Sequence, residues 1–227
     1  MRRFLLASAG VTAVAAWIGA APAADMSRPF PQVGRSAPSP IFNYAYNWTG
    51  PYAGINGGFG WGSSSWNGIP ASFDVNGGMF GGQIGYNWQF GSWVAGIEGD
   101  ADWTDLRGST TLGCPGGGPC ATKNDFLSTA RGRIGYASDR WMPYFTGGFA
   151  FGNIRATNPG LPGVDQTNGG WTIGGGLEGA LVGNWTARGE YLYVNLGTAG
   201  CAANCGLPAN NVGFTTNIFR GGLNYRF

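Results

Sequence analysis

The sequence predicts an all-β fold, an eight-stranded antiparallel up-and-down transmembrane β-barrel. Three observations predict it: an N-terminal segment typical of export, eight segments in which apolar and polar residues alternate, and connections that are alternately short and long. Alternation with a period of two is typical of a strand whose two faces meet different surroundings. Alternately short and long connections are typical of outer-membrane barrels.

The first 23 residues have the three parts of a secretory signal peptide. Met1-Arg2-Arg3 is basic, an apolar run extends from Phe4 to about Ala20, and Ala21-Pro22-Ala23 is a small-x-small cleavage site. The alternative, a transmembrane helix, lacks the charges of a stop-transfer segment. Residues 24–46 are rich in Pro and Ser and predict a flexible N-terminal segment. Residues 47–227 then form the predicted barrel domain.

Composition excludes several classes of protein. The chain has 13 basic and 11 acidic residues, a formal net charge of +2 and no His. This balance argues against a nucleic-acid partner. Gly and Pro are abundant, at 44 and 13 of 227 residues, but the 15% of aromatic residues argue against disorder.

Eight segments show the alternation of a strand. In the segment 93–103, for example, Trp93, Ile97 and Trp103 share one face while Glu98 and Asp100 lie on the other. The register of 142–151 stays open, because both of its faces are apolar. The expected strands are 52–61, 82–90, 93–103, 126–136, 142–151, 171–181, 185–193 and 217–227.

The connections alternate in length. Residues 91–92, 137–140 and 182–184 are short turns, whereas 62–77, 104–123, 152–169 and 195–214 are long loops. In outer-membrane barrels the short turns are periplasmic and the long loops extracellular.

Charges decide which face points inward. In a membrane barrel the apolar face is turned to lipid, whereas in a soluble barrel of the lipocalin kind it is turned inward. The polar faces carry five acids and five bases, and such a balance suits a packed interior, where an unpaired charge is costly. We therefore expect a charge network in the lumen, made by Glu98, Asp100, Asp102, Arg131, Arg133, Glu178, Arg188, Glu190, Arg220 and Arg226.

Neighbouring strands suggest the partners within this network. We expect Arg131 and Arg133 to pair with the acids of 93–103, and Glu178 to lie beside Arg188. The last strand must pair with the first, because an open edge is not tolerated in lipid. Aromatic residues near strand ends would form two interfacial girdles, and they are Trp61, Trp88, Trp93, Trp103, Tyr136, Trp171, Trp185 and Phe227.

The four cysteines, Cys114, Cys120, Cys201 and Cys205, are expected to form disulfides, since an exported chain meets an oxidising compartment. Four cysteines allow three pairings. The local pairs Cys114–Cys120 and Cys201–Cys205 would each close a short loop. A zinc site is disfavoured, because the chain has neither His nor C-x-x-C.

A succession of segments resembles a known family. "NWTGPYAGINGGFGWG" (47–62), "GGQIGYNWQFGSWVAGIEGDADW" (81–103), "RGRIGYA" (131–137), "PYFTGGFAFG" (143–152) and "GGLNYRF" (221–227) resemble the small outer-membrane β-barrel proteins of alphaproteobacteria, known as porin-family or immunogenic outer-membrane proteins. The chain departs from them at Pro51, where the family usually has an aromatic residue. The resemblance implies an OmpA-type eight-stranded barrel in the bacterial outer membrane. It also implies an assembly signal read by the barrel-assembly machinery, formed by Phe219, Leu223, Tyr225 and Phe227.

Catalysis is not expected. The G-x-G-x-x-G match at 174–179 lies inside an alternating strand rather than between a strand and a helix, and the carboxylates of 93–103 face arginines. Outer-membrane barrel enzymes to which we can compare the chain use a catalytic His, which is absent. We expect no cofactor and no metal; a haem-binding role, proposed for some relatives, would have to use Tyr.

Two functions stay open. The first is a structural, surface-exposed envelope protein, because eight strands enclose only enough room for their own side chains. The alternative is a narrow passive channel for ions or small solutes. The expected partners are outer-membrane lipid and the barrel-assembly machinery, and the long loops leave host or surface ligands open.

Overall fold

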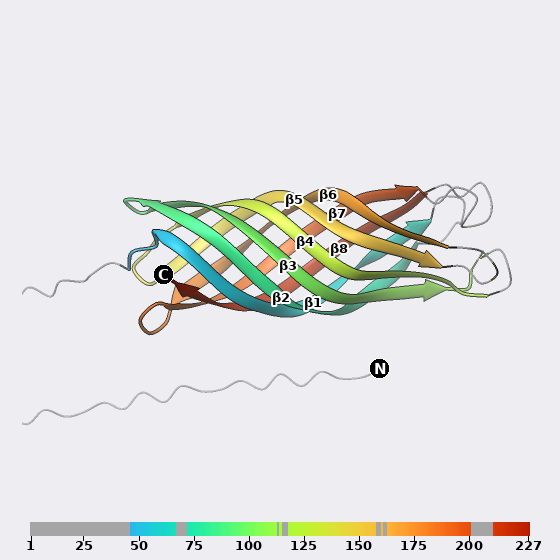
Figure 1. Ribbon diagram of the computed structural model, residues 1–227, viewed down its shortest axis with the longest axis horizontal. Coiled ribbons are helices and arrows are strands. Elements are labelled where there is room, and N and C mark those ends of the chain that lie inside the picture. The colour runs from blue at the N-terminus through green and yellow to red at the C-terminus, as the bar shows by residue number, and fades with distance from the viewer. Residues whose placement is uncertain are drawn as a thin grey trace, which may run out of the picture. The chain divides into compact units, whose positions relative to one another are not determined.

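The computed structural model describes residues 46–66, 72–112, 114, 118–157, 160, 163–200 and 211–227. Eight antiparallel strands in these residues close into one barrel in chain order, which confirms the predicted fold class (Figure 1). No helix in these ranges is long and apolar enough to cross a membrane. The predicted signal peptide and residues 24–45 lie outside them. The strands are β1 (Gly50–Trp66), β2 (Ser72–Phe90), β3 (Trp93–Thr110), β4 (Cys120–Tyr136), β5 (Trp141–Thr157), β6 (Val164–Ala180), β7 (Trp185–Gly200) and β8 (Asn211–Arg226).

The last strand closes the barrel against the first, as predicted. Tyr52 lies opposite Arg226 in the register of β1 and β8. The backbone N–H of Phe227 donates to the carbonyl of Pro51 at 3.1 Å, so the pairing continues to the last residue. Neither strand is left with a free edge, which is the condition for a sheet to span lipid.

Three short turns lie at the same end of the barrel as Phe227, and we call this the turn end (Figure 1). Gly91, Asp139 and Gly183 take positive φ values of 61°, 54° and 60° in these turns. Such a backbone conformation favours Gly and tolerates Asp, so these residues suit tight reversals. The opposite end, where the long connections lie, is the loop end.

The strands are longer than the sequence predicted. β1 extends to Trp66 and β2 begins at Ser72, so most of the predicted loop 62–77 is strand. The predicted loop 104–123 likewise gives seven residues to β3 and four to β4. Apolar and polar residues still alternate in these extensions, but there the apolar residues point inward and the polar residues outward. Because this is the opposite of the membrane part, the extensions were not predicted as strand.

The reversal exchanges the two faces of the wall. Up to Trp103, β3 turns apolar residues such as Ile97 outward and charged residues such as Glu98 inward. Beyond Trp103 the outward residue is Arg107 and the inward one is Leu106. Toward the turn end the barrel is therefore apolar outside and polar inside, as in a membrane protein. Toward the loop end it is polar outside and apolar inside, as in a soluble protein.

Exposed aromatic rings bound the outward apolar band on both sides. Trp93 and Trp103 are ten residues apart on β3, which corresponds to about 25 Å along the axis at ~3.3 Å per residue and a tilt of ~40°. This is the height of the apolar band in outer-membrane barrels. The turn-end girdle consists of Trp88, Phe90, Trp93, Tyr136, Trp141, Trp185, Tyr225 and Phe227, and the loop-end girdle of Trp61, Phe80, Trp103, Phe126, Phe151 and Trp171.

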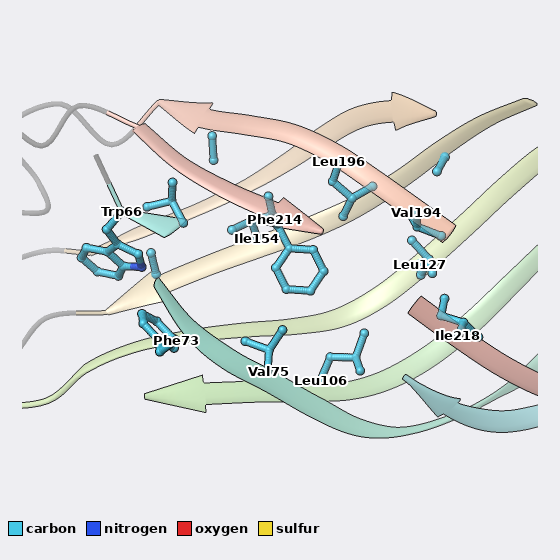
Figure 2. Close-up of a cluster of buried hydrophobic side chains, with 14 of the residues drawn as sticks. Trp66, Phe73, Val75, Leu106, Leu127, Ile154, Val194, Leu196, Phe214 and Ile218 are labelled. Atoms are coloured by element: carbon cyan, nitrogen blue, oxygen red, sulfur yellow. The ribbon is translucent and has the colours of Figure 1, made fainter. Parts of the chain in front are cut away.

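An apolar layer fills the barrel from just below the loop-end girdle toward the loop end. Figure 2 shows its side chains meeting inside the wall from strands on all sides. Cys120 belongs to it and is bonded to Cys114, which confirms one predicted disulfide. Cys201 and Cys205, the other predicted pair, lie outside the described residues. The layer includes Trp66, Phe73, Val75, Leu106, Leu127, Ile154, Val194, Leu196, Phe214 and Ile218.

Candidate functional site: the charged lumen

All ten charged residues that the sequence assigned to the lumen are buried. Nine of them form ion pairs with one another at mid-height of the apolar band, between the two girdles. We call these nine the ionic layer: Glu98, Asp100, Asp102, Arg131, Arg133, Glu178, Arg188, Glu190 and Arg220.

Glycine on the neighbouring strand makes room for each arginine of this layer. Gly148 lies directly opposite Arg131, Gly96 opposite Arg133, Gly222 opposite Arg188 and Gly58 opposite Arg220. A Cβ atom on Gly58 would lie 2.7 Å from the Cβ of Arg220. The excess of glycine in the strands therefore has a packing cause, because a narrow barrel can hold large side chains only where the facing position is empty.

Glu98 is the most connected carboxylate of the layer. It accepts hydrogen bonds from Arg131 and Arg188, and from the Tyr52 hydroxyl at 2.6 Å. The Arg133 guanidinium is 3.6 Å away. These partners come from β1, β4 and β7, so one residue on β3 holds side chains from several parts of the wall.

Arg220 of β8 is an arginine with three acidic partners. It donates to Asp102 at 2.8 Å, and to Asp100 and Glu190 at 3.0 Å each. Glu190 also accepts a 2.8 Å hydrogen bond from Arg131. Glu190 lies on the adjacent strand β7, but β3 and β8 are not neighbours in the barrel, so the bonds to Asp100 and Asp102 cross the lumen.

The predicted partners within the layer were partly wrong. Arg131 contacts Glu98 and Asp100, and Arg133 pairs with Glu98 at 3.6 Å, as expected. The shorter contact of Arg133, at 2.6 Å, is however with Glu178, and Asp102 pairs with Arg220. Glu178 lies directly opposite Arg188 in register, yet Arg188 reaches Glu98 instead. The long arginine side chains extend across the narrow lumen and reach carboxylates on strands that are not their neighbours.

Arg226 is the exception among the ten predicted residues. It is buried, but within the described residues its guanidinium forms no ion pair. It lies 5.2 Å from the ring centroid of Tyr46 and 5.5 Å from that of Trp48, as a cation–π contact requires.

The segment before β1 enters the barrel mouth at the turn end. The Trp48 side chain is 0% exposed and packs with Val94 and Met142. Its ring meets that of Tyr46 edge-on, with centroids 4.8 Å apart. We call Tyr46, Trp48, Val94 and Met142 the plug. The alternation of apolar and polar residues does not predict the plug, because Trp48 precedes the first alternating segment.

Uncharged polar groups complete the interior. Tyr144 donates to Glu190 at 3.0 Å, and this inward tyrosine settles the open register of the fifth strand. Gln83 accepts a 2.6 Å bond from Asn56 and donates a 2.7 Å bond to Asn224. Hydrogen bonding of this kind reduces the cost of burying charges away from water.

The five carboxylates of the lumen are its candidate groups for metal binding or catalysis. No group of three or more His, Cys, Asp or Glu in the described part of the chain could hold a metal ion. Its carboxylates are engaged with guanidinium groups, and a nucleophile beside a free base does not occur among the described lumen residues.

Comparison with known proteins places this architecture in a family. The family model described as "Outer membrane protein beta-barrel domain" matches residues 11–227. The chain belongs to this family. It is therefore a protein of the bacterial outer membrane, as the resemblance implied.

Two relatives from Brucella melitensis are similar over most of their length. The 31 kDa outer-membrane immunogenic protein is 38% identical over 85% of this chain and 89% of its own. The 25 kDa outer-membrane immunogenic protein is 30% identical over 100% of this chain and 99% of its own. Among solved structures, Neisserial surface protein A is similar with 16% identity and a TM-score of 0.45, over 79% of this chain and 98% of its own.

Proposed function

We propose that this member of the family is a structural, surface-exposed protein of the outer membrane, whose barrel is closed to solutes and performs no catalysis. The observation that carries the proposal is the ionic layer, in which nine charged side chains from both sides of the barrel meet at mid-height. The side chains of Arg131 and Asp100 are 0% exposed, which leaves them no contact with a water-filled passage.

Two further layers support a closed barrel. The apolar layer lies above the ionic layer, and the plug lies below it. Three obstacles in series would block solutes better than the ionic layer alone. An ion would also have to cross the apolar layer, where the buried hydroxyls of Ser64 and Thr122 are already hydrogen-bonded to each other.

A surface role also agrees with the relatives. They are named immunogenic, and we propose that the loop end of this chain is likewise displayed outside the cell. The barrel would then act as a rigid anchor for the extracellular connections.

Conductance of the purified protein in planar bilayers tests the proposal against the passive channel. We expect no stepwise current from the wild type. We also expect none from the Arg220→Ala/Asp102→Ala double variant, because the apolar layer still closes the lumen. Wild-type current steps would overturn the proposal if they vanish on boiling and change size in Arg220→Ala, since the current would then pass through the lumen.

We further propose that Phe227 is recognised during assembly. Its ring is 75% exposed on the lipid-facing side, so its deletion removes only about 1.5–3 kcal/mol of apolar burial from the finished barrel. Outer-membrane levels should nevertheless fall when the residue is deleted, while refolding in detergent is unaffected. Unchanged levels in cells would contradict this role.

A further inference from the structure

Three basic residues form one row on the outer face of the barrel near the loop end. Arg107 of β3 lies directly opposite Lys123 of β4, which lies directly opposite Arg155 of β5. Like charges that face each other across strands destabilise a sheet. The repulsion within a row of three must therefore be offset by anions, either acidic side chains nearby or an external ligand.

The positive charge of the outer surface is concentrated here. Of the nine basic residues in the described ranges, five lie in the lumen and Arg140 lies in a turn at the opposite end. The remaining three are the members of this row. On the described outer wall near the loop end, all basic side chains thus lie at one level, on the three adjacent strands β3, β4 and β5.

That level is at the outer edge of the lipid headgroup region. Arg107 lies four residues beyond Trp103 of the loop-end girdle, and Arg155 four residues beyond Phe151. Four residues of a tilted strand rise about 10 Å. The headgroup region extends about 5–8 Å beyond the hydrocarbon core, and long basic side chains can bend toward it.

The row borders a groove in the outer wall with a volume of about 500 Å³. Ser109 and Thr157 add hydroxyl groups to its lining, and no carboxylate lines it. Two hydroxyls and three cations around one depression form a surface suited to an anion with several oxygen atoms.

Acidic neighbours compete for the same cations. Arg155 contacts Asp125 at 3.2 Å and Asp165 at 2.7 Å, and Lys123 also pairs with Asp125. Arg107 pairs with Asp105, so every cation of the row has a carboxylate neighbour. The hydrogen bond from Lys123 lowers the pKa of the Asp125 carboxyl, which keeps it charged. These pairs are exposed, and exposed pairs contribute little, so a stronger anion can replace them.

We propose that Arg107, Lys123 and Arg155 bind the phosphate group of a phosphorylated lipid headgroup in the outer leaflet. A guanidinium can donate two parallel hydrogen bonds to a phosphate, and the row offers two guanidinium groups with an ammonium between them. The aromatic girdle below would contact the acyl chains of the same lipid.

Binding of diphosphorylated lipid A to the protein in phosphatidylcholine nanodiscs, measured by native mass spectrometry, tests the proposal. The variant with all three residues changed to Gln should bind about tenfold more weakly or worse, since each cation near an anionic surface contributes several-fold. Arg140→Gln, which removes the same charge at the other end, should bind like the wild type. Asp125→Asn should bind more tightly, because a competing anion is gone.

Three results would overturn the proposal: unchanged binding by the triple variant, equal loss in Arg140→Gln, or equal binding of dephosphorylated lipid A. Competition distinguishes other sources of the anion. Millimolar inorganic phosphate or a sulfated polysaccharide that displaces lipid A completely would show a site for a soluble ligand instead. The heat-dependent gel shift of folded barrels verifies that each variant retains the native state.

Discussion

Arg188 of β7 forms an ion pair with Glu98 of β3, although the residue directly opposite Arg188 on the neighbouring strand β6 is Glu178. The pair crosses the lumen and connects opposite walls of the barrel. Arg220 with Asp102 and Arg131 with Glu190 do the same. Charges in the lumen therefore link the barrel across its diameter, while backbone hydrogen bonds link it around its circumference.

Removing Glu98 should destabilise the barrel strongly. Glu98→Ala removes the one acidic partner of Arg188 among the described residues, while Arg131 keeps Asp100 and Glu190. The unpaired Arg188 should cost about 3–5 kcal/mol in a dry interior. Urea unfolding in lipid vesicles measures this. Asp165→Ala is the control, because it breaks the exposed pair with Arg155 and should cost at most about 1 kcal/mol. Equal midpoints for the two variants would contradict a packed ionic layer.

Two adjacent glycines of β5 should respond differently to the same substitution. A Cβ on Gly148 would overlap the carbonyl oxygen of Ala130 and lie 2.7 Å from the Cα of Arg131. On the outer face, the nearest atom to a Cβ on Gly147 is the Thr172 carbonyl oxygen at 3.5 Å. We expect Gly148→Ala to lower the unfolding midpoint and Gly147→Ala to be neutral or to stabilise by about 0.4–1 kcal/mol. If both variants unfold together, the packing account of the inward glycines is wrong.

Trp48 should contribute to stability although it precedes the first strand. Trp48→Ala removes the largest side chain of the plug, and such core truncations cost about 3–5 kcal/mol. Trp48→Phe keeps an aromatic ring above Arg226 and should lose less. Equilibrium unfolding and protease cleavage of the N-terminal segment would measure both effects. Wild-type stability and cleavage in Trp48→Ala would show that the plug does not hold the barrel mouth.

The sequence predicted the membrane part of the fold well because its signals are local. A period of two fixes which residues share a face, and Gly91 or Gly183 marks a turn. The lumen residues followed from the same alternation. Ion-pair partners followed only between neighbouring strands, as for Arg131 with Glu98. Arg188 meets Glu98 across the lumen, and that contact depends on the stagger of the closed barrel, which no local sequence pattern encodes.

The loop-end extensions were missed for a different reason. Val75 and Phe214 alternate with polar neighbours, but there the apolar residues point inward, opposite to the membrane part. In β4 the inward positions also change parity, from Asn124 to Leu127, where the β4–β5 register shifts. A bulge of this kind breaks the period that a sequence pattern depends on.

The exchange of faces between Trp103 and Asp105 is the central claim about this protein, and a spin-label scan along β3 tests it most directly. Labels at single cysteines from Trp93 to Thr110, in protein whose four native cysteines are Ser, report collisions with oxygen in lipid and with a water-soluble nickel complex. We predict oxygen access at Ala95, Ile97 and Trp103, nickel access at Arg107 and Ser109, and little of either at Asp100 and Leu106. Oxygen access that persists through Ser109, or nickel access at Asp100, would contradict the exchange of faces and the closed lumen.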